Sequence, residues 1–146
     1  MSSRFRTTTL DDIDPIAVAG VHWKPVRRTL GIGAFGINAY TADEGERVVE
    51  EHDERNDAGD GGHEELYVVV AGHARFTIDG EDLDAPPGTL VFLPEPAAHR
   101  GAVAVADGTV VLAIGADPER PFTVSEWEDR FVAEGTPAGG REDAPT

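Results

Sequence analysis

The segment GGHEELYVVVAGHARFTIDGE, residues 61–81, places charged residues directly before a run of strand-forming residues. Successive side chains of a β-strand point to opposite faces, so His63, Glu65, Tyr67 and Val69 share one face of the predicted strand. The opposite face is also apolar, which predicts a strand that is covered on both sides. We expect the interior of a barrel on one side, and a second sheet, the N-terminal segment or a partner subunit on the other.

The rest of the chain repeats this pattern of short apolar runs separated by turns. Its 17 glycines and 10 prolines fall between runs rich in Val, Ile, Phe and Tyr, which is typical of an all-β sandwich or barrel. The sequence predicts one hairpin around residues 71–73 and a second at the Asp-Gly turn of residues 79–82. Further strands are expected over residues 32–42, 45–54, 89–93 and 107–116.

The C-terminal part has a different character. Residues 123–135 predict a short helix, in which Ser125 and Glu128 resemble a capping box and Trp127 and Phe131 share one face. The predicted organisation is an N-terminal segment (1–30) that packs on the barrel, the β-barrel (31–122), this helix, and a disordered tail (136–146).

Charge and composition limit the partners. The formal net charge is −16, which argues against nucleic acid and against anionic membranes, because both require Lys and Arg on the binding surface. There is no cysteine, so disulfides, thiolate zinc sites and cysteine nucleophiles are excluded. The first ten residues lack the apolar core of a secretion signal, from which we expect a cytoplasmic location.

Residues 88–103 carry a spaced motif that resembles the second conserved motif of the cupin family. That motif reads G, five residues, P, one residue, G, two residues, H, three residues, N. Gly88, Pro94 and His99 fit it in register, whereas Pro96 replaces the usual glycine and Val103 replaces the asparagine. The resemblance, which covers roughly residues 32–116, implies a double-stranded β-helix, the small jelly-roll barrel of cupins.

The first cupin motif is matched only at its end. Glu65 and Gly72 have the spacing of its closing E, six residues, G. The H-x-H pair that precedes this glutamate in the family is not in place. The nearest equivalents, with one residue of slippage, are Glu50 and His52, so the loop between the two strands is longer than in the family.

The resemblance also implies a metal site. Most metal cupins bind one divalent ion through three histidines and one glutamate, and this chain supplies such a set in His52, His63, Glu65 and His99. Because His63 and Glu65 are two residues apart and face the same way, both can reach one ion. Imidazole nitrogens with one carboxylate suit Fe, Mn, Ni, Cu or Zn, and the ligands alone do not select among them.

Two functional interpretations remain open. The first is a metal-dependent enzyme, of the oxygenase, isomerase or decarboxylase class, that acts on a small organic substrate in the barrel. The second is a non-catalytic module that binds or senses a small ligand, with a degenerate metal site. In both, Tyr40, Tyr67 and Phe92 are expected to line the pocket, and the doubly apolar strand favours a homodimer.

Overall fold

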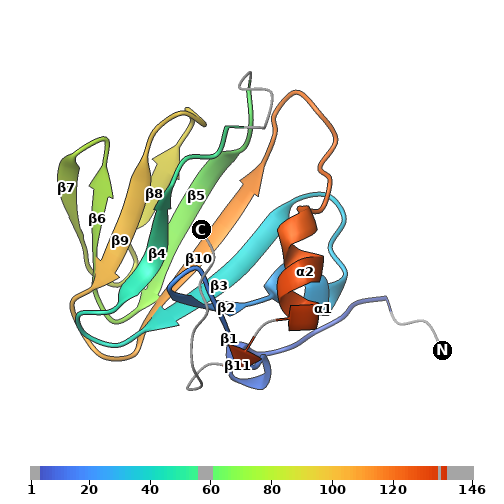
Figure 1. Ribbon diagram of the computed structural model, residues 1–146, viewed down its shortest axis with the longest axis horizontal. Coiled ribbons are helices and arrows are strands. Elements are labelled where there is room, and N and C mark those ends of the chain that lie inside the picture. The colour runs from blue at the N-terminus through green and yellow to red at the C-terminus, as the bar shows by residue number, and fades with distance from the viewer. Residues whose placement is uncertain (1–3, 56–60, 135, 138–146) are drawn as a thin grey trace.

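Two antiparallel sheets face each other in the computed structural model, which describes residues 4–55, 61–134 and 136–137 (Figure 1). The larger sheet has the strand order β11-β1-β2-β3-β10-β5-β8, and the smaller has the order β4-β9-β6-β7. This arrangement confirms the predicted all-β jelly-roll barrel with a short C-terminal helix. In chain order the elements are η1 (Leu10–Asp12), β1 (Ile16–Val18), β2 (Val21–Lys24), α1 (Val26–Leu30), β3 (Gly36–Ala42), β4 (Arg47–His52), β5 (Glu64–Ala71), β6 (Ala74–Ile78), β7 (Glu81–Ala85), β8 (Leu90–Leu93), β9 (Arg100–Ala104), β10 (Thr109–Ala116), α2 (Glu126–Glu134) and β11 (Thr136–Pro137).

Strand β5 has the phase that the sequence predicts. Tyr67 and Val69 are buried in the core between the sheets, where the Tyr67 ring lies 5.3 Å from the ring of Phe76 in the facing sheet. The outer face of the strand is less covered, since Val70 is 47% exposed. The inner cover of β5 is therefore confirmed, and on the outer side the described residues cover only about half of Val70.

The turn at residues 71–73 is not a hairpin, which corrects the prediction. β5 belongs to the larger sheet and β6 to the smaller one, so the chain passes from one sheet to the other at Gly72. Gly72 has φ +72°, and a Cβ there would lie 2.4 Å from the Cα of Thr109. The second predicted hairpin is confirmed, because Asp79 and Gly80 both have positive φ and connect the paired strands β6 and β7.

The N-terminal residues belong to the larger sheet. β2 pairs with β3 and β1 pairs with β2, so these residues lengthen the sheet. Trp23 of β2 is fully buried and packs against Trp127 of α2, with ring centroids 4.9 Å apart, and Phe131 joins the same cluster. Trp127 and Phe131 share one face of α2 as predicted, with ring centroids 6.2 Å apart. Within the described ranges no helix is long and apolar enough to span a membrane.

Helix α2 is attached to the barrel by a buried ion pair. The Glu128 carboxylate accepts hydrogen bonds from Arg27 Nε and Nη2, at 3.3 and 3.1 Å. Glu128 therefore binds a distant arginine, and only its backbone N–H bonds to Ser125, at the carbonyl oxygen. Residues 138–146 of the predicted tail lie outside the described residues.

Candidate functional site

A cavity of about 1170 Å³ lies between the strands and the segment that leads into α2. Strands β3, β4, β5 and β10 contribute wall residues on one side, and residues 120–128 contribute them on the other. The wall combines the aromatic side chains of Tyr40, Tyr67 and Trp127 with several carboxylates and imidazoles. A mixed wall of this kind is typical of small-molecule sites, in which apolar area supplies contact and a few polar groups fix orientation.

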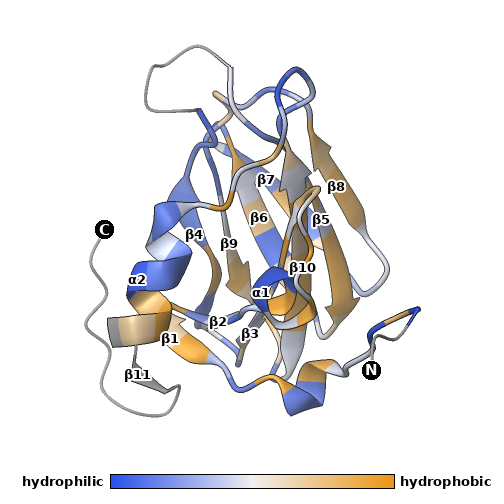
Figure 2. Ribbon diagram, turned by 90° about the vertical axis from the view of Figure 1, so that its right-hand side faces the viewer, coloured by the Kyte–Doolittle hydropathy of each residue, from blue (hydrophilic) through white to orange (hydrophobic). Residues whose placement is uncertain are grey.

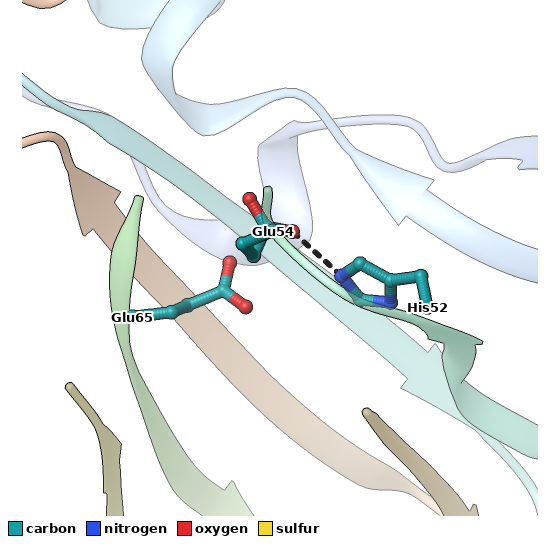
Figure 3. A group of neighbouring side chains, drawn as sticks. All are labelled: His52, Glu54 and Glu65. Carbon is teal, nitrogen blue, oxygen red and sulfur yellow. Dashed lines mark hydrogen bonds and ion pairs between the residues drawn. The ribbon is translucent and has the colours of Figure 1, made fainter. Parts of the chain in front are cut away.

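Three ionisable side chains converge on this cavity. His52 ends β4, Glu54 follows it by two residues, and Glu65 projects from β5 (Figure 3). One ligand atom from each of the three lies within 4.8 Å of the others. The His52 Nε2 atom is 2.6 Å from Glu54 Oε2, and Figure 3 shows the carboxyl groups of Glu54 and Glu65 turned toward each other.

Glu65 is also held from the side that faces the barrel core. Its Oε1 atom accepts a hydrogen bond of 2.8 Å from Arg100 Nη1 and another from the Tyr67 hydroxyl. Arg100 is fully buried and is fixed at its other end by a 2.9 Å bond from Nε to the Ala98 carbonyl oxygen. The negative charge of Glu65 is therefore paired inside the protein.

Burial and charge pairing act against each other in this group. Burial opposes the charged form of His52, but the hydrogen bond and the charge of Glu54 outweigh it and raise the pKa of His52 to about 9. Burial likewise opposes ionisation of Glu54, yet its bonds with His52 and His63 bring the pKa of its carboxyl well below the usual range. Without a bound ion, a protonated His52 therefore neutralises an ionised Glu54 at neutral pH.

The pKa of the second carboxyl group, that of Glu65, shifts in the opposite direction. Burial and the neighbouring charge of Glu54 raise the pKa of Glu65, while Tyr67, His52 and Arg100 act in the lowering direction. Two carboxylates that share one buried site resist simultaneous ionisation, so the proton is held on one of them. A bound cation removes that conflict, because both carboxylates can then carry charge.

His63 lies at the edge of the group. Its Nδ1 atom is 3.5 Å from Glu54 Oε1, and its ring is 5.8 Å from the ring of Phe122. Phe122 in turn packs beside Gly36, where a Cβ would come within 3.3 Å of the Phe122 ring. The histidine thus connects the segment before α2 to the carboxylate of Glu54.

The structure brings together most of the side chains that the sequence singled out. His52, His63 and Glu65, together with Tyr40 and Tyr67, line the cavity. His99 does not join them, because its ring is 56% exposed and its Nε2 atom bonds to Glu51 Oε2 at 2.9 Å on the outer surface.

Phe92 also lies away from this cavity. It is 56% exposed and borders a smaller hollow between the end of β8 and the end of β6. The strand period explains its position, since Val91 and Leu93 on either side of it are buried.

Two site residues, Glu54 and Arg100, were not foreseen. Glu54 lies in an acidic run that is usually solvated surface, and nothing local distinguishes it. A signal for Arg100 does exist, because it alternates with Ala102 and Ala104, both of which are buried in β9. A charged residue in phase with buried alanines indicates an inward-facing charge that requires a partner.

The donors of this group fit a divalent metal ion. One imidazole nitrogen with two carboxylates is a ligand set that Mn, Fe and Zn accept. His52 Nδ1 lies 2.7 Å from the Glu50 carbonyl oxygen, so an N–H at Nδ1 donates to it and Nε2 faces the carboxylates. Metal-binding histidines commonly have this outer hydrogen bond, which fixes the tautomer and the ring orientation. His52, Glu54 and Glu65 are the residues that would hold the ion.

Solved structures confirm the fold. A cupin protein from Bacteroides fragilis superposes with a TM-score of 0.62 at 16% identity, over 85% of this chain and 93% of that chain. KdgF from Halomonas sp. has a TM-score of 0.61 at 22% identity, over 79% and 96% of the two chains. A predicted oxalate decarboxylase from Thermotoga maritima has a TM-score of 0.61 at 16% identity, over 77% and 99%. At such identities these neighbours share the fold alone.

The family is shown by a second comparison. No curated protein matches the chain. The family model of the AraC-like ligand binding domain matches residues 48–134, which run from β4 through α2 and include all the residues of the His52–Glu54–Glu65 group. Since this match spans more than half of the sequence, the chain belongs to the AraC-like ligand binding domain family of the cupin superfamily.

Proposed function

We propose that this chain binds a divalent transition-metal ion in its cavity through His52, Glu54 and Glu65, and that a small organic molecule binds beside it. The observation that carries the metal site is the convergence of one imidazole nitrogen and two carboxylate groups within 4.8 Å. Such an ion acts as a Lewis acid toward an oxygen of the bound molecule. Fe, Mn, Ni, Cu and Zn all suit nitrogen and carboxylate donors, so the identity of the ion is left to measurement.

The histidines of the chain have different places in this site. His52 is the nitrogen ligand, and His63 holds Glu54 from the cavity edge, at 3.5 Å from its Oε1 atom. His99 is not among the ligands, because it is exposed and bonded to Glu51. This assignment differs from the set that the cupin resemblance implies, in which His99 binds the ion.

The rest of the cavity supports an organic ligand. Asn38 lines the cavity, and its Oδ1 atom is buried without a hydrogen-bond partner among the described residues. A buried acceptor left unpaired costs about 1–3 kcal/mol, which a donor on a bound molecule or a water removes. Tyr40 and Trp127 add apolar wall beside it.

Elemental analysis of purified, untagged protein tests the metal site. Wild-type protein reconstituted with each candidate metal is expected to bind close to one equivalent, and Glu54→Gln is expected to lose it. His99→Ala is the matched control and is expected to retain the metal, because its imidazole lies on the outer surface. Loss of metal from His99→Ala but not from Glu54→Gln would contradict the assignment of ligands.

A second candidate function is ligand sensing without a metal. Arg100 already pairs with Glu65 at 2.8 Å, so this carboxylate has a partner charge without any ion. Wild-type protein that stays at background metal after reconstitution, yet gains thermal stability with a small organic ligand, would favour this alternative.

We further propose that a second copy of the chain covers the outer face of β8. Leu90 and Phe92 are 66% and 56% exposed there, on a strand that pairs with β5 and lies at the edge of the larger sheet among the described residues. Figure 2 shows β8 and the adjoining part of β5 coloured as hydrophobic. A symmetric contact buries this face, and salt strengthens it by screening the net charge of −16. Light scattering is expected to give a dimer for wild type and a monomer for Leu90→Lys/Phe92→Lys; a monomeric wild type at high salt would contradict it.

A further inference from the structure

The carboxyl group of Glu65 is bonded at one oxygen only. Its Oε1 atom accepts hydrogen bonds from both Arg100 Nη1 and the Tyr67 hydroxyl. Its Oε2 atom receives no hydrogen bond from any described residue. One oxygen is therefore already used by the protein, and the other is available to an ion held by Glu65 together with Glu54 and His52.

Arg100, one of the two donors to Oε1, is buried and has a second hydrogen bond. Arg100 has no exposed surface, and its Nε atom bonds to the Ala98 carbonyl oxygen at 2.9 Å. The guanidinium is thus tied at two points, one on its own strand region and one on Glu65. Its Nη2 atom is buried without a hydrogen-bond partner among the described residues.

We infer that Arg100 and Tyr67 are positioning residues of the proposed metal site: by occupying Oε1 they make Glu65 a ligand through Oε2 alone. The inference rests on the proposed metal site. A one-oxygen glutamate, a second glutamate and an imidazole leave more coordination positions open to an organic ligand than a two-oxygen glutamate would. Outer-shell partners of this kind typically change metal affinity by about 10-fold to 100-fold when they are removed.

Positioning and charge predict opposite results for this pair. Arg100 places a fixed positive charge beside the ligands, and charge alone would make its removal tighten the binding of a cation. Positioning predicts the reverse, because Glu65 then loses its fixed orientation. Tyr67→Phe separates the two effects, since it removes a hydrogen bond to Oε1 without changing the charge.

The test is titration with Co²⁺ alone, followed by visible absorption, which reports the coordination of the ion. Tyr67→Phe and Arg100→Met are expected to bind Co²⁺ about 10-fold to 100-fold more weakly than wild type, with altered absorption bands. Arg100→Lys keeps the charge and one donor, and is expected to recover part of the affinity. Thr77→Val is the matched control, because it likewise removes a hydroxyl that donates to a carboxylate, that of Asp82 at 3.0 Å, on strand β6 away from the cavity; its affinity and spectrum are expected to stay as in wild type.

The outcomes separate the two proposals. Wild-type protein that binds no Co²⁺ overturns the metal site and this inference with it. Wild type that binds Co²⁺ while Tyr67→Phe keeps the same affinity and absorption bands overturns only the positioning role. Tighter binding by Arg100→Met also overturns it, because charge and not orientation then controls the affinity. Tyr67→Phe keeps the buried ring, so its result stands even where Arg100→Met fails to fold.

Discussion

Two histidine–glutamate pairs of this protein have almost the same local geometry and opposite surroundings. His52 Nε2 lies 2.6 Å from Glu54 Oε2, with side chains that are 26% and 20% exposed. His99 Nε2 lies 2.9 Å from Glu51 Oε2, with side chains that are 56% and 47% exposed. The inner pair lines the cavity, and the outer pair lies outside the cavity wall.

The difference between the pairs is what surrounds them. Beside the inner pair lies a second acid, Glu65, to which the fully buried cation Arg100 is bonded. Beside the outer pair lies the cation Arg47, 3.5 Å from Glu51 and partly exposed to water. A histidine–carboxylate contact thus becomes a candidate site only where other charges converge on it and solvent is too scarce to screen them.

The largest difference between the inner and outer pairs is expected in the stability that their neighbouring arginines, Arg100 and Arg47, contribute. Arg100→Met leaves Glu65 as an unpaired carboxylate in a buried position, and is expected to lower the free energy of unfolding by about 3–5 kcal/mol. Arg47→Met removes a partly exposed partner of Glu51 and is expected to cost about 0–1 kcal/mol. Urea unfolding followed by tryptophan fluorescence measures both. Equal losses would show that burial does not separate the inner charges from the outer ones.

The next largest difference between the two pairs is expected in how the free energy of unfolding depends on pH, measured on metal-free protein with a chelator present. The pKa of His52 is raised to about 9 in the folded state. The stability contributed by its charged form is therefore fully present below the pKa of an unfolded histidine, about 6.5. It is lost as pH rises through about 9. The stability gap between wild type and His52→Gln is therefore expected to shrink by about 2–3 kcal/mol from pH ~6.5 to pH ~10.

His99→Gln is the control for this measurement, since its ring is mostly in solvent. Its stability gap to wild type is expected to stay within about 0.5 kcal/mol, as for most surface substitutions. A gap that narrows equally for His52→Gln and His99→Gln would contradict the assignment of the pH dependence to the buried pair.

The sequence predicts the fold well, and of the proposed metal ligands it singles out His52 and Glu65 but not Glu54. Alternation along β5 puts Glu65, Tyr67 and Val69 on one face, and the structure confirms it because a strand with a buried face cannot shift by one residue. The error at residues 71–73 arises because a turn sequence does not specify whether the next strand pairs with the last one. Here β6 pairs with β9 and β7 in the other sheet.

The site is harder to predict than the fold, because it depends on which residue begins strand β9 and so on which of its side chains point inward. The motif spacing favours His99, yet β9 begins at Arg100, and the alternating period then sends Arg100 inward. Glu54 is set by a longer loop whose path local sequence does not encode, and its neighbour Arg55 forms an isolated bridge to Gly62. The starting residue of β9 and the path of the loop after β4 thus decide which charged side chains come together.

The smallest expected effect is the coupling within the outer pair itself. A double-mutant cycle with His99→Gln and Glu51→Gln is expected to give about 0–1 kcal/mol, as exposed ion pairs do. The matching cycle with His52→Gln and Glu54→Gln is expected to exceed it, since charged hydrogen bonds shielded from water contribute about 1.5–3 kcal/mol.

Salt distinguishes the two cycles further. At about 1 M salt the screening length falls to about 3 Å, so the outer coupling, between side chains that are 56% and 47% exposed, is expected to vanish. The inner coupling is expected to persist, because His52 Nε2 and Glu54 Oε2 lie 2.6 Å apart and both side chains are mostly buried. Inner coupling that disappears with salt would mean that the cavity wall is as well solvated as the outer surface. That result would contradict both the proposal of a buried ion site and the raised pKa of His52.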